Sequence, residues 1–182
     1  MSALPYTQNK HIYVLQPSSA LLMAAAKLSS TCNVTNSCGS VLSMSRPCWD
    51  ETWMTIARTV ADRSYDQRLK VGAIIVSEDN TRLLSLGYNG NYRGGPNTPD
   101  SDEPGMSGFI HAEINALLKS DFTFPSRKIM YVTHSPCEMC CKCIINAGIN
   151  EVVYEKTYRN EKGITYLLHA GVYVRQYKLV KL

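Results

Sequence analysis

The chain has 182 residues, of which 45% are hydrophobic and 19% charged, a composition that suits one globular domain and leaves little room for a second. Its longest unbroken apolar run covers residues 20–26, far short of the roughly 20 residues that span a bilayer, so no membrane segment is expected. The formal net charge is +4, and half of it comes from Lys10 and Lys27, so the rest of the chain lacks the dense basic surface typical of nucleic-acid-binding proteins.

The cysteines give the first indication of chemistry. There are seven, an odd number, and four of them lie within residues 137–143. Clustering at C-x-x-C spacing is typical of metal binding rather than of a disulfide framework. We therefore expect a reducing compartment, namely the cytoplasm, or the host cytoplasm if the protein is viral.

Residues 1–46 differ in composition from the rest of the chain. They are rich in Ser, Thr and Asn, contain no acidic residue and show no sustained helical or strand period. Three interpretations stay open: a disordered or non-core extension, a true start at Met44, and a signal-peptide core at residues 18–27. The weakly basic flank before residue 18 counts against export. We expect no chemistry in this part and assign the functional domain to residues 47–182.

Hydrophobic periodicity predicts a first helix from about Trp49, with Asp50 as its cap. Its apolar positions recur at helical spacing, at Trp53, Ile56, Ala57, Val60 and Ala61. Two apolar runs joined by a short turn, residues 71–76 and 82–88, predict a β-hairpin. Residues 89–108, rich in Gly, Pro, Asn and Asp, are expected to form a loop.

Helices and strands alternate over the remainder of the chain. We predict helices at about 111–119, 137–147 and 161–170, and strands at 128–133, 151–155 and 172–176. This alternation predicts an α/β domain of three layers, α/β/α, around a mixed sheet of roughly five strands. The hairpin strands should be antiparallel, and the later strands, which are linked through helices, should be parallel.

Two short segments carry the candidate chemistry, each where a loop becomes a helix. The first is His111-Ala112-Glu113, and the second is Pro136-Cys137-Glu138-Met139-Cys140. Cysteines three residues apart share one face of the first helical turn, so Cys137 and Cys140 can reach one ion together with His111. Three protein ligands leave a fourth zinc position open, which is typical of a catalytic site.

Glu113 is the candidate proton shuttle because it lies two residues from the expected ligand His111. Zinc lowers the pKa of a bound water from about 16 to roughly 7, and a carboxylate beside that water can take and return a proton. H-x-E followed by P-C-x-x-C is the signature of zinc-dependent nucleobase deaminases. We therefore predict a deaminase with one catalytic zinc ion.

Other cysteine and histidine residues have simpler interpretations. Cys141 and Cys143 are expected to be structural thiols on the helix that carries the zinc ligands. His134, beside the end of a predicted strand, is not expected to bind metal, and whether it lines the pocket stays open. The more widely spaced cysteines do not predict a second metal site; these are Cys32, Cys38 and Cys48.

Longer segments resemble the deoxycytidylate (dCMP) deaminase family, of phage and bacterial type, within the cytidine deaminase-like superfamily. They are residues 70–76 (KVGAIIV), 86–95 (LGYNGNYRGG), 111–116 (HAEINA), 131–140 (YVTHSPCEMC) and 144–154 (IINAGINEVVY). The resemblance runs from about residue 49 to 177 and implies hydrolytic deamination of dCMP to dUMP, for thymidylate supply. It also implies that Asn89, Ala112 and Tyr158 bind the substrate, and that Arg159 helps to bind its phosphate.

The resemblance implies regulation as well. Many relatives are hexamers that dCTP activates and dTTP inhibits, with a Gly-Tyr-Asn-Gly segment at the regulatory site, here Gly87, Tyr88 and Gly90 around Asn89. Some phage relatives carry a second zinc. In this chain Asp66 and Gln67 replace one set of its ligands, and the 89–108 loop has no cysteine, so a single zinc is predicted.

Three competing functions stay open. A deaminase of tRNA adenosine or of a cytosine polynucleotide needs a basic approach surface, and many tRNA enzymes have Glu where this chain has Ser135. A dCTP deaminase is also compatible, whereas free cytidine deaminases normally begin their zinc pattern with Cys. A non-enzymatic zinc-stabilised module is disfavoured because folding does not require Glu113.

Overall fold

The computed structural model describes residues 46–158 and 162–178 of the chain. Five strands form one sheet in the order β2-β1-β3-β4-β5. The strands are β1 (Gly72–Ser77), β2 (Leu83–Tyr88), β3 (Lys128–His134), β4 (Glu151–Lys156) and β5 (Tyr173–Gln176), and the helices are α2 (Trp49–Ala61), α3 (Ala112–Leu117), α4 (Glu138–Asn146) and α5 (Lys162–His169). The interpretations of residues 1–46 fall, except for the last residue, outside the described residues and stay predictions.

The sheet is mixed, as expected. β1 is antiparallel to both β2 and β3, whereas β3, β4 and β5 are parallel to one another. The tight turn between β1 and β2 allows only the antiparallel arrangement, and the helical crossovers through α4 and α5 produce the parallel pairs. The carboxyl ends of β3 and β4 therefore meet at one edge of the sheet, where His134 pairs with Lys156.

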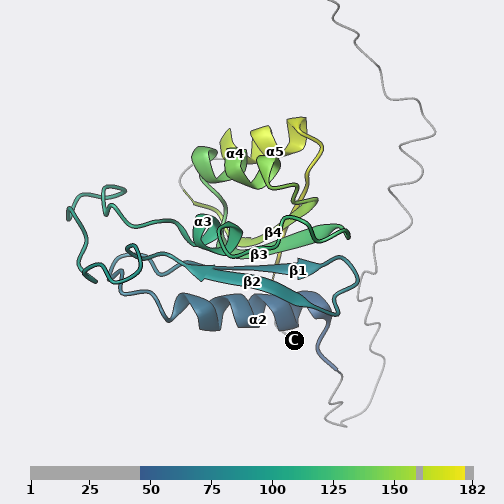
Figure 1. Ribbon diagram of the computed structural model, residues 1–182, viewed down its shortest axis with the longest axis horizontal. Coiled ribbons are helices and arrows are strands. Elements are labelled where there is room, and N and C mark those ends of the chain that lie inside the picture. Colours follow the sequence, from purple (N-terminus) through teal and green to yellow (C-terminus); the bar gives the residue numbers. More distant parts are fainter. Residues whose placement is uncertain (1–45, 159–161, 179–182) are drawn as a thin grey trace, which may run out of the picture. The chain divides into compact units, whose positions relative to one another are not determined.

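Helices cover both faces of the sheet, so the predicted three layers are confirmed (Figure 1). On β1, Ile74 and Val76 pack with α2 in one core cluster, while Ala73 and Ile75 pack with α3, α4 and α5 in the other. Alternate residues of a strand point to opposite faces, and a strand covered on both sides is apolar throughout. All six residues of β1 are accordingly buried.

The helix expected over residues 111–119 is shorter in the structure. α3 ends at Leu117, because the amides of Lys119 and Ser120 bond to carbonyls three residues back rather than four. Such tightening satisfies the last carbonyls of a helix.

Within the described residues, no helix combines the length and the apolar character that a bilayer crossing requires.

Gly87 in β2 lies against α3, the helix that follows His111. A Cβ atom at Gly87 would lie 2.3 Å from the carbonyl oxygen of Ala112 and 2.4 Å from the amide nitrogen of Ala116. Both are backbone atoms of the helix and cannot move without displacing it. Because Gly87 has no side chain, β2 can pack closely against α3, the helix that positions the candidate site.

We expect Gly87→Ala to lower the free energy of unfolding by about 3 kcal/mol, because the added methyl group overpacks the interface between β2 and α3. Urea denaturation measures this change. Gly90→Ala is the matched control, since a Cβ there meets nothing nearer than the Tyr88 ring at 3.7 Å. Equal losses of stability in the two variants would contradict the packing argument.

Arg175 on β5 joins three elements of the fold. Its Nη2 donates to Asp50 Oδ1 at 2.8 Å and its Nε to Glu151 Oε1 at 2.6 Å. The Tyr131 hydroxyl on β3 donates to the same Asp50 oxygen at 2.7 Å. Burial alone would raise the pKa of Asp50, but hydrogen bonds from Arg175 and Tyr131 more than offset it and lower the pKa overall. The network fastens the edge strand β5 to α2.

Arg175→Met is expected to cost about 2 kcal/mol of unfolding free energy, because it leaves a partly buried Asp50 without its cation. Since folding lowers the pKa of Asp50, this stabilisation is complete above about pH 4, the value in an unfolded chain, and is lost as the pH falls. Chemical denaturation at pH 7 and at pH 3 should therefore show a smaller difference between wild type and variant at pH 3.

Arg127→Met is the control for this prediction. Arg127 pairs with Glu78 at 3.0 Å, but both side chains are more than half exposed, and pairs of this kind contribute at most about 1 kcal/mol. A loss as large for Arg127→Met as for Arg175→Met would show that the buried network has no special role.

Candidate metal centre and active site

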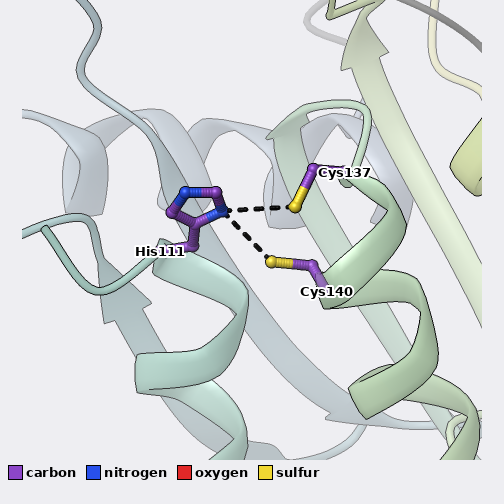
Figure 2. Close-up of side chains that lie close together, drawn as sticks. All are labelled: His111, Cys137 and Cys140. Atoms are coloured by element: carbon purple, nitrogen blue, oxygen red, sulfur yellow. Dashed lines mark hydrogen bonds between the residues drawn. The ribbon is translucent and has the colours of Figure 1, made fainter. Parts of the chain in front are cut away.

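The candidate ligands lie where two loops enter α3 and α4. His111 is the N-cap residue of α3 and Cys137 that of α4, and both have extended backbone conformations. Neither side chain forms a capping hydrogen bond to its helix. Cys140 is the third residue of α4, one turn after Cys137. Figure 2 shows one nitrogen of the His111 ring facing both sulfur atoms.

The three donor atoms lie at distances that suit one zinc ion. His111 Nδ1 is 3.3 Å from Cys140 Sγ and 3.5 Å from Cys137 Sγ. All three donors lie within 4.8 Å of one another. In a tetrahedral site with ordinary Zn–S and Zn–N bonds, adjacent nitrogen and sulfur ligands are about 3.5 Å apart. The geometry and the donor types therefore fit zinc, and this is the one such cluster found among the described residues.

The two thiols of the cluster shift each other's pKa in opposite directions. The pKa of Cys137 is lowered to about 3, chiefly by a hydrogen bond from Cys140 and also by the nearby His111. The same bond raises the pKa of Cys140. Cys137 is thus poised as a thiolate, the form that binds metal, and zinc would displace the remaining proton from Cys140.

Glu113 lies beside the metal donors, in the first turn of α3. It is 4% exposed, and Cys140 forms a hydrogen bond with its side chain. Burial raises the pKa of Glu113, because a desolvated carboxylate is disfavoured relative to its neutral form. A carboxyl group in this position can accept a proton as the carboxylate and release it as the acid.

A cavity of about 830 Å³ opens onto these residues, within the range of roughly 300–1,000 Å³ that small-molecule sites occupy. The cavity is formed by the residues that precede β1, by the loop before α3 and its first turn, and by the residues that follow β3 and β4. Its lining comprises Asp66, Arg68, Leu69, Val71, Asn89, Pro104, Gly105, Ser107, Phe109, His111, Ala112, Glu113, His134, Ser135, Cys137, Glu138, Met139, Thr157 and Tyr158. The structure thus brings two of the predicted metal ligands, His111 and Cys137, to one cavity together with Glu113, Asn89, Ala112, Tyr158 and His134. The third ligand, Cys140, is buried and does not line this cavity.

A family model described as the cytidine and deoxycytidylate deaminase zinc-binding region matches residues 47–156. The chain belongs to this family. The resemblance, the fold class and the zinc requirement predicted from the sequence are therefore confirmed.

Relatives and solved structures agree with this assignment. ComE operon protein 2 of Bacillus subtilis is 39% identical over 143 residues, which cover 75% of each chain. The deoxycytidylate deaminase of Saccharomyces cerevisiae is 34% identical over 148 residues, or 75% of this chain and 47% of that one. The chain thus spans about half the length of the yeast relative.

A solved structure of dCMP deaminase from the cyanophage S-TIM5, in complex with dCMP and dUMP, matches with a TM-score of 0.62 and 33% identity. The match covers 73% of this chain and 99% of that chain. The whole of the phage enzyme thus corresponds to part of this chain.

Asn89 has a well-defined role within the fold of this family member. Its Nδ2 donates to Leu69 O at 2.8 Å and to Asp66 Oδ2 at 3.2 Å, and its Oδ1 accepts the Val71 amide at 2.8 Å. Both amide hydrogens are thereby used inside the protein. A ligand in the cavity can be met by the second lone pair of Oδ1, so Asn89 would act as a hydrogen-bond acceptor.

The other residues that the resemblance implicates fall into two groups. Ala112 and Tyr158 line the cavity, and the Tyr158 amide donates to the buried Ser135 hydroxyl at 2.8 Å. Arg159 lies outside the described residues. Burial is the largest cause that lowers the pKa of His134, so its imidazole is neutral at pH 7. His134 therefore lines the cavity as an uncharged group.

The residues that the resemblance places at a regulatory site do not all line one cavity in the structure. Tyr88 and Gly90 line a second cavity of about 260 Å³, whereas Gly87 packs against α3 and is not part of that lining. Gly90 and Ile110 exchange backbone hydrogen bonds at 3.1 and 2.9 Å, directly before His111. Phe109 lines both cavities. The second cavity is thereby connected to the loop that carries the first metal ligand.

Sequence reasoning missed Arg68 and Phe109 as cavity residues. Arg68 belongs to the segment before β1, which was considered only for its lack of metal-binding cysteines. Phe109 sits between the long loop and the His-Ala-Glu segment. Both could be predicted from the order of the elements. The segments that directly precede β1 and α3 lie at the same edge of the sheet as the helix N-termini that carry the metal ligands.

Proposed function

We propose that the protein catalyses the hydrolytic deamination of dCMP to dUMP and ammonia. The observation that carries this proposal is the position of buried Glu113 at the wall of one large cavity, next to the cluster of three metal donors. The match to a phage dCMP deaminase solved with dCMP and dUMP supports the substrate assignment. The alternative substrates are dCTP and tRNA adenosine.

Different residues of the chain bind zinc, transfer protons and orient the nucleotide. Zinc held by His111, Cys137 and Cys140 would lower the pKa of a water to about 7 and so supply the nucleophile at neutral pH. Glu113 accepts one proton of the attacking water and transfers it to N3 of the cytosine. It then takes the second proton from the hydroxyl group added at C4 and delivers it to the amino group, which leaves as ammonia when the C4–N bond breaks. Asn89 orients the nucleotide through Oδ1, and Tyr158 packs at the cavity wall against the base.

A substrate panel tests this proposal. Purified, zinc-loaded protein is incubated with dCMP, deoxycytidine, dCTP and a tRNA substrate, and deamination of each is followed. We expect rapid turnover of dCMP and slow turnover of the others. Turnover of dCTP or tRNA without turnover of dCMP would overturn the substrate assignment and would identify the actual substrate.

We extend the proposal to regulation by nucleotides, as the resemblance implies. The second cavity, lined by Tyr88 and Gly90, is the candidate site for dCTP and dTTP, and its backbone link to Ile110 provides a route to His111. Addition of dCTP to the dCMP assay should raise activity, and dTTP should lower it. Assembly into an oligomer, with a hexamer as the expected form, and a cytoplasmic location belong to the same proposal.

A further inference from the structure

Asp66 is a buried carboxylate that belongs neither to the metal cluster nor to the proposed proton transfer. It is 8% exposed and lines the large cavity, as Asn89 does. Its Oδ1 accepts the backbone amides of Arg68 at 2.8 Å and Leu69 at 3.2 Å, and its Oδ2 accepts Asn89 Nδ2 at 3.2 Å. All three partners are donors, so the position requires two acceptor oxygens, which an ionised carboxylate supplies.

The main chain of Asn89 is held by the same part of the chain. The Ser64 hydroxyl donates to the Asn89 carbonyl oxygen at 2.8 Å and accepts the Asp66 amide at 3.2 Å. The Asn89 amide donates to the Val71 carbonyl oxygen at 3.2 Å. Because its main chain is fixed in this way, the orientation of Asn89 toward a ligand is decided by its side-chain amide group.

That amide group has two orientations of nearly the same shape, related by a half-turn about its terminal bond. In the structure Nδ2 faces Asp66 Oδ2 at 3.2 Å and the Leu69 carbonyl oxygen at 2.8 Å, whereas Oδ1 faces the Val71 amide at 2.8 Å. A half-turn would place Oδ1 against two acceptor oxygens, one of them charged. Repulsion disfavours that orientation, so the second lone pair of Oδ1 is left for a ligand.

We infer that Asp66 is a positioning residue for Asn89: it fixes the side-chain amide so that the acceptor Oδ1, and not the donor Nδ2, meets the nucleotide. This inference rests on the proposed deamination of dCMP and adds the group that sets the polarity of one substrate contact. Asp66 acts through Asn89 and need not touch the nucleotide itself.

Two substitutions of Asp66 distinguish this role from a structural one. Asp66→Asn keeps the shape of the side chain but replaces one acceptor oxygen by an amino group. Two backbone amides require the remaining oxygen, so the amino group would face Asn89 Nδ2, donor against donor, and would favour the half-turn of the Asn89 amide. Asp66→Ser keeps an acceptor for the turn at residues 66–69, but its side chain is too short to reach Asn89.

The first test compares kcat/KM for dCMP in zinc-loaded wild type, Asp66→Asn and Asp66→Ser. We expect Asp66→Asn to lower kcat/KM about 30-fold, mainly through KM, and Asp66→Ser to lower it about fivefold. A structural role predicts the reverse order, because asparagine is closer than serine to aspartate in shape. A loss in Asp66→Ser that equals or exceeds the loss in Asp66→Asn would overturn the inference.

A double-mutant cycle with Asn89→Ala tests whether Asp66 acts through Asn89. In the Asn89→Ala background, Asp66→Asn should change kcat/KM for dCMP by less than about threefold, because no side-chain amide remains to be turned. Equal losses in the two backgrounds would show that Asp66 acts independently of Asn89 and would overturn the inference.

Asp79→Asn is the matched control, since it makes the same change in another turn. Asp79 Oδ1 accepts the Thr81 amide at 3.1 Å, between β1 and β2, and Asp79 lines neither of the two cavities described above. Asp79→Asn should have wild-type kcat/KM for dCMP. A loss as large as that of Asp66→Asn would assign both effects to the turns and would overturn the inference.

A binding measurement separates this inference from the proposed function. Calorimetric titration with dUMP reports recognition of the nucleotide without turnover. We expect Asp66→Asn and Asn89→Ala to weaken dUMP binding by similar factors, and the double variant to bind no more weakly than Asn89→Ala. This result would support the role of Asp66 even if wild type did not deaminate dCMP. Wild-type affinity of Asp66→Asn for dUMP would contradict the inference and leave the proposed deamination intact.

Discussion

Glu113→Gln is expected to lower kcat for dCMP by about 10³-fold to 10⁴-fold while zinc stays bound. Glutamine keeps the shape of the side chain, but it cannot take a proton from water or deliver one to the leaving amino group. Because Glu113 is 4% exposed, solvent cannot easily replace it as the proton carrier. Steady-state kinetics give kcat, and elemental analysis gives the zinc content of the same sample.

The control for this variant is Glu51→Gln, an exposed carboxylate in the first turn of α2, on the other face of the sheet. It should retain wild-type activity. Full activity of Glu113→Gln would show that Glu113 does not transfer protons in the reaction. Loss of zinc together with activity would instead assign Glu113 to the metal site.

Cys140→Ser is expected to remove zinc, abolish turnover and lower the melting temperature by about 10 °C. Cys140 is 1% exposed and lies within 3.3 Å of His111 Nδ1, so a serine hydroxyl would occupy the site without supplying a thiolate. A metal present at about 1,000 times its dissociation constant adds about 4 kcal/mol to the folded state, which corresponds to that temperature shift in a protein of this size. Zinc content and thermal melting measure both effects.

Cys143→Ser is the matched control on the same helix. Cys143 is a half-buried thiol outside the cluster of three donors, so its variant should keep one zinc ion per chain and nearly full activity. Equal zinc contents in Cys140→Ser and Cys143→Ser would contradict the ligand assignment. Two zinc ions per wild-type chain would contradict the prediction of a single ion.

Most of the fold could be predicted from the sequence because its signals are local. The apolar spacing from Trp53 to Ala61 and the continuous run at 71–76 each determine one element. The metal cluster could be predicted because Cys137 and Cys140 share one helical turn. The convergence of His111 on them follows from the position of α3 and α4 on one face of the sheet.

Long-range contacts between side chains could not be predicted in the same way. Arg175 and Asp50 are 125 residues apart, and no local pattern links them. In the sequence, Asp66 indicates only that a metal-binding cysteine is absent, yet its carboxylate accepts hydrogen bonds from Arg68, Leu69 and Asn89. Such contacts depend on how separate segments meet at the edge of the sheet, which spacing along the chain does not encode.

The most direct test of the central claim is deamination of dCMP in water enriched in ¹⁸O. Zinc-loaded protein is incubated with dCMP, ammonia is quantified, and the nucleotide product is analysed by mass spectrometry. Hydrolytic deamination predicts one ammonia for each dUMP formed and one ¹⁸O atom in each dUMP, at the carbonyl that replaces the amino group. Recovery of unchanged dCMP from fully zinc-loaded protein would contradict the account.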